Sequence, residues 1–188
     1  MKKSLGAKPL VYPTPVFIVG SYDQDQKPNA MSVAWGGIVC SQPPCVSISL
    51  RKATYSYGNI MTRKAFTVSI PSEQHIREAD YFGIASGRNE NKFEVAKLTA
   101  VKSSLVDAPY VQEFPLVLEC RVIHVLEIGL HTLFVGEILD VKADAEVLNQ
   151  KGMPEIEKVK PCLFAPESWS YYGIGRNLGQ AFSIGKKL

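Results

Sequence analysis

The chain has 188 residues, of which 46% are hydrophobic and 21% charged, values that are typical of a globular protein and exclude a mainly disordered one. Its 21 lysines and arginines exceed its 18 aspartates and glutamates by only three, and its longest basic runs have two residues. This excludes the basic stripe of a nucleic-acid-binding protein, and no apolar segment reaches the roughly 18 residues of a membrane helix. The apolar run after Met1-Lys2-Lys3 is too short for a signal peptide, so we expect one cytoplasmic domain over residues 1–188.

Short runs rich in valine and isoleucine, bounded by proline, glycine, aspartate and asparagine, predict a mainly β protein. The expected strands are Val16–Tyr22, Ala30–Cys40 with a bend at Gly36-Gly37, Cys45–Leu50, Phe66–Ile70, Leu116–Glu127 and His131–Val141. The polar segment 23–28 and the short connection at Gly129 predict two hairpins. One face of the strand Leu116–Glu127 carries Glu119 and Arg121 at its centre, so we expect that face to be partly solvated or to lie at an interface.

Helical signals are fewer and lie between these strands. Thr54 is suited to cap a helix over residues 55–61, Ser72 precedes a helix over 73–85, and a short helix is expected over 91–98. Strands come in consecutive hairpins, and the βαβ alternation of a parallel sheet is absent. The sequence therefore predicts an antiparallel barrel with a few peripheral helices.

Several common functional motifs do not occur. The glycines at 173–179 are spaced one residue too far apart for a dinucleotide-binding loop, and there is neither a P-loop nor a Gly-x-Ser-x-Gly motif. His75, His124 and His131 lack metal-ligand spacing, so we predict no metal site. The four cysteines form no Cys-x-x-Cys motif and are expected to be free thiols.

Three polar clusters stand out against this background. Residues 28–35 place amide and hydroxyl groups beside a tryptophan on a predicted strand. Residues 47–56 place two cations and several hydroxyls at a helix start, which suits a phosphate monoester because helix N-termini and cations bind dianions. Residues 86–93 place Ser86, Arg88 and Lys92 around a turn at Gly87 and offer further anion contacts. Taken singly, each cluster also fits an ordinary strand, turn or surface loop.

Together and in this order, the clusters resemble the flavin reductase-like, FMN-binding split-barrel family, and within it the flavoredoxin-type branch. The resemblance covers nearly the whole chain from about residue 10. Its matching segments are residues 15–20, 27–35, 41–44, 54–56, 86–88, 92–93, 129–132, 136–137 and 171–175. Two positions depart from the family pattern, because Ser69 replaces a frequent asparagine and Asn91 replaces a frequent aspartate.

The resemblance implies an antiparallel, Greek-key-like split β-barrel that forms a homodimer and binds FMN near the subunit interface. The implied phosphate-binding residues are Arg51, Thr54, Tyr55, Ser56, Ser86, Gly87 and Lys92. The implied ring-binding residues are Asn29, Ala30, Met31, Ser32 and Trp35, with Ser49 and Leu50 nearby. His131 and Tyr172 are expected to border the reacting face, and no side chain acts as a nucleophile because the flavin carries the chemistry.

The resemblance leaves two classes of function open. One is an enzyme, an NAD(P)H:flavin oxidoreductase that takes NAD(P)H as co-substrate. The other is a non-enzymatic flavoprotein that carries electrons between redox protein partners. A third reading, a related barrel that has lost flavin and binds haem, is disfavoured by the cations and hydroxyls of the phosphate-binding clusters.

Overall fold

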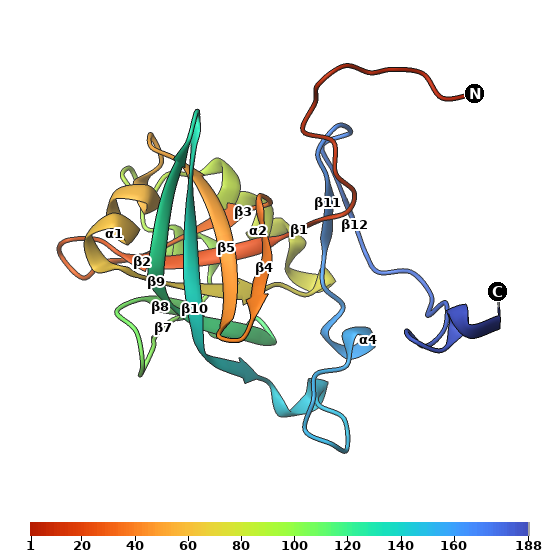
Figure 1. The fold of residues 1–188 in the computed structure, drawn as a ribbon. Coiled ribbons are helices and arrows are strands. Elements are labelled where there is room, and N and C mark those ends of the chain that lie inside the picture. Colours follow the sequence, from red (N-terminus) through yellow and green to blue (C-terminus); the bar gives the residue numbers. More distant parts are fainter. Residues whose placement is uncertain (188) are drawn as a thin grey trace.

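The computed structural model describes residues 1–187; Leu188, the last residue of the expected domain, lies outside the described residues. Within residues 1–187, one curved antiparallel sheet of seven strands dominates the fold, in the order β3-β2-β6-β9-β10-β5-β4 (Figure 1). Its strands are β2 (Phe17–Tyr22), β3 (Pro28–Val33), β4 (Gly36–Ser41), β5 (Pro44–Arg51), β6 (Ala65–Ile70), β9 (Leu116–Ile128) and β10 (His131–Ala143). The predicted mainly β, antiparallel architecture is confirmed.

The expected strand Ala30–Cys40 is two strands on opposite edges of the sheet. β3 pairs with β2, whereas β4 pairs with β5, so the chain crosses from one edge to the other after β3. Ser49 N donates to the carbonyl of Trp35 over 2.8 Å, which extends the β4–β5 pairing by one residue back towards the end of β3. Gly36 is required at this crossing, because a Cβ there would lie 2.7 Å from the carbonyl oxygen of Ser47.

Two smaller sheets were not predicted, because strands of two or three residues show no readable alternation. β1 (Thr14–Pro15), β11 (Leu163–Ala165) and β12 (Ser170–Tyr172) form one of them. β7 (Ala100–Lys102) and β8 (Pro109–Val111) form the other. Figure 1 shows β11 and β12 standing beside the barrel, with both chain ends on their side of the molecule.

The three expected helices are present, with shifted ends. They are α1 (Tyr55–Arg63), α2 (Ile76–Ile84), which follows the 3-10 turn η1 (Glu73–His75), and α3 (Lys92–Ala96). Thr54 occupies the N-cap position of α1, but its hydroxyl donates to the carbonyl of Arg51 over 2.9 Å and caps no helix N–H. The short helix α4 (Ile156–Val159) and the 3-10 turns η2 (Ala145–Val147) and η3 (Ile184–Lys187) were not predicted. No helix within residues 1–187 is long and apolar enough to span a membrane.

Two hydrophobic clusters hold the fold together, and β2 contributes to both because its residues alternate between the faces of the sheet. Val19 points into the barrel with Phe66 and Phe134. Ile18 points to the outer face, where it packs with Phe82 of α2 and other apolar side chains under the helices. This double burial fixes α2 and α3 against β3, which positions the site described below.

The charged face of β9 is partly solvated, as expected, because Arg121, Ile123 and Val125 are exposed whereas Glu119 is not. Glu119 is fully buried, and its carboxylate accepts a hydrogen bond from the Nζ of Lys142 on β10. Lys142 also bonds Asp140 over 3.0 Å, so a second strand supplies the charge that lets Glu119 leave water. Arg121 follows the prediction, since it is exposed and pairs with Glu137 over 2.6 Å.

The cysteines are free thiols, as predicted; Cys40 is exposed, whereas Cys45, Cys120 and Cys162 are buried. His124 lies opposite Val135 in the β9–β10 pair, whereas His131 lies opposite Ile128, so the two histidines are not paired across the hairpin. Among residues 1–187, no group of three or more His, Cys, Asp or Glu side chains could hold a metal ion.

Candidate functional site

A cavity of about 210 Å³ opens where β3, the start of α1, the end of α2 and the start of α3 meet. All the residues predicted to bind a phosphate line it except Arg51, together with Asn29 and Met31 from the predicted ring-binding set. Its lining consists of Asn29, Met31, Ala53, Thr54, Tyr55, Ser56, Phe82, Gly83, Ala85, Ser86, Gly87, Arg88 and Lys92. Segments that are separate in the sequence are therefore brought together as the resemblance implied.

Local structure explains this convergence. Asn29 and Met31 are two residues apart on β3, so they share one face of the strand. Helix α1 begins at Tyr55, so its first backbone N–H groups have no partner within the helix. Gly87 lets the following loop close over both elements, because a Cβ there would lie 2.2 Å from Oδ1 of Asn29 and 3.0 Å from the ring of Tyr55.

Lys92 is a buried cation at the base of this cavity. Only 4% of the residue is exposed, and its Nζ donates to the carbonyls of Phe82 at 3.1 Å and Ala85 at 3.2 Å. Within residues 1–187 it forms no salt bridge with a carboxylate, and burial lowers the pKa of its ammonium group to about 8. A buried charge with only carbonyl partners is unfavourable, so an anion entering the cavity would stabilise it through the remaining N–H.

Asn29 and Ser56 form a second polar pair in the wall. The Nδ2 of Asn29 donates to the Oγ of Ser56 over 2.8 Å, and both residues are buried. The Ser56 oxygen is an acceptor in this bond, so its own O–H is free to donate into the cavity. The Oδ1 of Asn29 is buried without a hydrogen-bond partner. A ligand that donates a hydrogen bond to this oxygen would satisfy it.

Arg88, and not Arg51, is the second cation of the cavity. Its guanidinium lies 5.4 Å from the centre of the Tyr55 ring and donates to the carbonyl of Ala53 over 3.0 Å. The hydroxyl of Tyr55 in turn donates to Asp23 over 2.7 Å, and this hydrogen bond raises the pKa of Tyr55. Arg51 ends β5 as an exposed residue opposite His131 and does not line the cavity. Arg88 adjoins Gly87 in the third polar cluster, which was the sequence signal for its place here.

A second, more apolar cavity of about 380 Å³ adjoins the first at Gly83, which lines both. Its lining consists of Pro15, Val16, Ser32, Ala34, Asp80, Gly83, Ile84, Phe164, Trp169 and Tyr171. A hydrogen bond of 2.8 Å from the Tyr171 hydroxyl to Asp80 supplies a fixed polar pair, and burial followed by this bond raises the pKa of Tyr171. The cavity of about 210 Å³ around Lys92 is suited to an anion and is named the anion-binding cavity. An apolar slot of this size beside it suits a phosphorylated aromatic ligand. Sequence reasoning missed Asp80, Phe164 and Tyr171, which come from α2, β11 and β12.

Ala30, which was predicted to line the ring, and Leu50, which was predicted to lie near it, line neither of these two cavities. Ala30 is fully buried under α2 and α3, and Leu50 is buried in the barrel interior. Successive side chains of a strand point to opposite faces of the sheet. A prediction over consecutive positions of a strand therefore includes side chains from both faces.

The remaining predicted residues lie apart from the anion-binding cavity. Trp35 lines a separate cavity of about 280 Å³ with Pro13, and Tyr172 lines another of about 400 Å³ with Tyr12. Ser49 is half-buried on β5 and faces Leu133. His131 begins β10 at the end of the long hairpin. The structure of one chain therefore does not bring these four residues to the anion-binding cavity.

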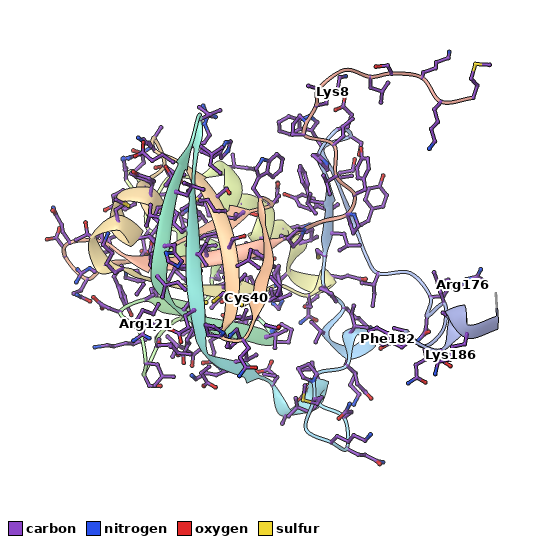
Figure 2. All side chains as sticks on the ribbon, viewed as in Figure 1. Lys8, Cys40, Arg121, Arg176, Phe182 and Lys186 are labelled. Atoms are coloured by element: carbon purple, nitrogen blue, oxygen red, sulfur yellow. The ribbon has the colours of Figure 1, made fainter. Side chains whose placement is uncertain are left out.

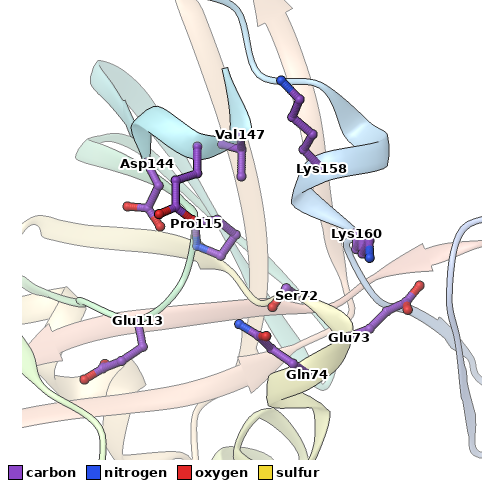
Figure 3. Close-up of a pocket in the computed structure, with 10 residues that line it drawn as sticks. Ser72, Glu73, Gln74, Glu113, Pro115, Asp144, Val147, Lys158 and Lys160 are labelled. Carbon is purple, nitrogen blue, oxygen red and sulfur yellow. The ribbon is translucent and has the colours of Figure 1, made fainter. Parts of the chain in front are cut away.

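A further cavity, of about 350 Å³, lies between η1, η2 and α4 (Figure 3). Glu73, Glu113, Asp144 and Glu146 contribute four carboxylates to its wall, against two ammonium groups from Lys158 and Lys160. This excess of negative charge disfavours a phosphate, which distinguishes it from the cavity around Lys92.

The sequence matches the flavin reductase like domain over residues 10–167, which is most of the chain. The chain belongs to the flavin reductase-like family. Among solved structures, it is similar to a flavoredoxin of Desulfovibrio vulgaris (Miyazaki F), with 56% identity, a TM-score of 0.95, and coverage of 99% of this chain and 100% of that one. A flavoredoxin from Methanosarcina acetivorans shows 29% identity and a TM-score of 0.90, with coverage of 100% and 97%.

Among sequence relatives of this flavin reductase-like chain, an NADPH-flavin oxidoreductase of Streptomyces viridifaciens is 27% identical over 130 residues. That match covers 68% of this chain and 66% of the relative. The family resemblance and the split β-barrel fold that the sequence analysis expected are confirmed.

Proposed function

We propose that the protein binds FMN in the two adjoining cavities and uses it as an oxidoreductase that takes electrons from NAD(P)H. The observation that carries this proposal is the buried Lys92, which has no carboxylate partner within residues 1–187 and lies beside an apolar slot. An FMN phosphate supplies the missing anion, and its ring system fits the slot. The flavoredoxins and the NADPH-flavin oxidoreductase reported above support this assignment.

In this proposal the phosphate lies in the cavity of about 210 Å³. Lys92 and Arg88 donate charge-assisted hydrogen bonds to its oxygens, and the free N–H groups at the start of α1 point their dipoles at it. The hydroxyls of Ser56 and Ser86 complete the shell. Gly87 closes the loop over the group and excludes water from its inner side, which strengthens each of these bonds.

Gly83, Phe164 and Trp169 line the apolar slot and would hold the ring system of FMN. Bound there, FMN supplies hydride and electron transfer, which no side chain of the chain can provide. The protein's contribution is to orient the ring and to keep one face open. Tyr171 donates its only O–H to Asp80, so its oxygen is a fixed hydrogen-bond acceptor at the edge of the slot.

A carrier of electrons between protein partners is the second candidate function. It is favoured by the 56% identity, over essentially the whole of both chains, to a protein named flavoredoxin. The two functions differ in what must approach the flavin, since a nicotinamide stacks on the ring whereas a protein needs only an exposed edge.

We also propose that the functional unit is a homodimer in which a second copy covers the outer half of the β9–β10 hairpin. Figure 1 shows this hairpin extending beyond the rest of the barrel. It exposes 56% of Leu126, 56% of Ile128 and 64% of Leu130, an apolar surface that association would remove from water. A double variant, Leu126→Lys with Ile128→Glu, should sediment as a monomer, whereas Leu105→Lys on an exposed loop should sediment as wild type. A monomeric wild-type protein would contradict the dimer.

The decisive experiment for function is an anaerobic visible spectrum of the FMN-loaded protein after gel filtration, during titration with NADH and then NADPH. Retention of the flavin band followed by rapid bleaching supports the oxidoreductase. Retention without bleaching favours the electron carrier. Loss of the flavin on the column, with an unaltered fold by circular dichroism, overturns both.

A further inference from the structure

The turn between β4 and β5 brings two thiols together on the outside of the barrel. Cys40 lies directly opposite Cys45 in the antiparallel pair formed by these strands. Residues directly opposite each other in such a pair have Cα atoms about 4.5–5.5 Å apart. This falls within the roughly 4.4–6.8 Å that a disulfide spans, and the pair lies between the register shift after Ile38 and the turn.

The side chains of both cysteines are on the same face of the sheet. On β5, Val46 and Ile48 point into the barrel core, so Cys45 belongs to the alternate, outer set. The Sγ of Cys40 lies 3.3 Å from the carbonyl oxygen of Gln42, and the Sγ of Cys45 lies 3.4 Å from that of Pro43. These two acceptors belong to consecutive residues of the turn between β4 and β5, so both sulfur atoms lie close to this turn.

The two thiols have complementary accessibility. Cys40 is exposed, and Figure 2 labels it on the barrel beside this turn, whereas Cys45 is 3% exposed. Burial, then the neighbouring Cys40 and Glu137, raise the pKa of Cys45, which lowers its thiolate fraction and its reactivity towards reagents in solution. Cys40 is therefore the thiol that a reagent from solution meets first, and Cys45 is the thiol placed to react with it afterwards.

We propose that Cys40 and Cys45 are a thiol-oxidation site, which a small-molecule disulfide converts to a reversible intramolecular disulfide at the edge of the barrel. The thiolate of Cys40 attacks one sulfur of the reagent, whose S–S bond breaks, and one reagent thiolate leaves. Cys45 loses its proton to solvent and attacks the Cys40 sulfur, and the second reagent thiolate leaves. The two cysteines lose two electrons and two protons, and the reagent disulfide is reduced to two thiols.

The disulfide would link β4 to β5 beside the turn that connects them, where the two backbones are already paired. Because β4 is the last strand at its edge of the sheet, this modification changes the barrel edge and leaves the flavin cavities intact. Cys120 and Cys162 are buried in the two hydrophobic clusters, and Cys120 lies opposite Ile138 and Phe66 rather than opposite a second thiol. They provide an internal control in any thiol assay.

The test uses the full-length protein, reduced and desalted, then exposed to oxidised glutathione and blocked with N-ethylmaleimide in denaturant. The expected intact mass shows a protein that has lost two hydrogen atoms, carries no glutathione and is blocked at only two thiols. Peptide mapping should place the new bond between Cys40 and Cys45. A stable glutathione adduct on Cys40 beside a free Cys45, or a bond from Cys45 to Cys120, would overturn the proposal.

Single variants separate the two steps. Cys45→Ser should accumulate the glutathione adduct on Cys40, because no second thiol resolves it, and Cys40→Ser should leave Cys45 reduced. Cys120→Ala is the matched control and should form the disulfide as the wild type does. Formation of the same product at an unchanged rate in Cys40→Ser would contradict the assigned order. The wild-type mass measurement stands even where a variant fails to fold.

Discussion

Lys142 on β10 and Lys92 at the start of α3 are both partly or fully removed from water, but their ammonium groups have different partners. Their pKa values are shifted in opposite directions. Lys142 is hydrogen-bonded to Glu119 and Asp140, and although burial acts to lower its pKa, these bonds together raise it. Lys92 has two carbonyl partners and no carboxylate salt bridge within residues 1–187, and burial lowers its pKa to about 8.

This difference in partners indicates that Lys142 stabilises the fold, whereas Lys92 is placed to bind a ligand. Lys142 has two carboxylate partners on β9 and β10, so its charge is compensated without a ligand and helps to hold the two strands together, although Oε1 of Glu119 is buried without a partner. The charge of Lys92 is offset only in part by the attraction of Glu90, which does not prevent burial from lowering the pKa, so an anion that enters the cavity would relieve an unfavourable burial. Substitutions at the two positions should therefore have opposite consequences for stability and for flavin affinity.

The largest expected effect is that of Lys142→Met on stability. Removing this partner leaves the carboxylate of Glu119 buried without a counter-charge, which should lower the free energy of unfolding by about 3 kcal/mol. Urea denaturation of the wild-type and variant apoproteins measures it, and FMN affinity should stay within twofold of wild type. A change of less than about 1 kcal/mol would show that Glu119 does not depend on this lysine.

Lys92→Met is the opposite case. Loss of a charge-assisted hydrogen bond to the phosphate should weaken FMN binding by about 30-fold, equivalent to about 2 kcal/mol. The apoprotein should be at least as stable as wild type, because a buried charge without a counter-charge has been removed. Quenching of flavin fluorescence gives the affinity, and riboflavin, which lacks the phosphate, is the matched ligand control. Equal losses for FMN and riboflavin would remove Lys92 from the phosphate site.

The lowered pKa of Lys92 predicts the pH dependence of FMN binding. A bound dianion favours the protonated lysine, so binding takes up a proton once the free protein has begun to lose it, and affinity should fall as pH rises above about 8. Titration calorimetry in two buffers of different ionisation enthalpy measures this proton uptake. Lys92→Arg keeps its charge and should abolish the dependence, whereas proton uptake that persists in this variant would point to another group.

The lowered pKa of Lys92 predicts the opposite pH dependence for the stability of the apoprotein, which should rise with pH where FMN affinity falls. Lysine in the unfolded chain has a pKa of 10.5, so between pH 8 and 10.5 the unfolded state binds more protons than the folded one. The contribution of Lys92 to stability therefore rises with pH across this window and is least favourable below it. Lys92→Met should remove that rise from the wild-type stability curve measured in denaturant.

The long elements and most of the anion-binding cavity could be predicted from the sequence, because their signals are local. Thr54, Ser56, Gly87 and Lys92 stand next to turns and helix starts whose chemistry is readable in a few residues. The apolar slot could not be predicted, because Phe164 and Tyr171 reach it from strands of three residues, which have no periodicity.

Charge placement failed for a related reason. The sequence predicted a face that is partly solvated or at an interface, but not which of its charges is buried, because Lys142, the partner of Glu119, is on another strand and alternation alone cannot indicate a counter-charge across a sheet. The resemblance assigned Arg51 to the phosphate, whereas Arg88 was noted only as a further anion contact of the third polar cluster. The structure shows instead that Arg88 donates to the carbonyl of Ala53, and this contact between separate segments places its guanidinium at the cavity.

The smallest expected effect tests how Arg88 is held. In Tyr55→Phe the ring under the guanidinium remains and only the hydrogen bond to Asp23 is lost, so FMN affinity should change by less than threefold. Arg88→Gln should lower it by about fivefold, a modest loss because this cation is partly solvated and its contribution is screened. Measuring both variants in low and high salt sharpens the contrast with Lys92, since only the Arg88 contribution should shrink markedly as salt rises. A loss in Tyr55→Phe as large as that in Arg88→Gln would mean that the tyrosine hydroxyl itself, and not the ring, positions the arginine.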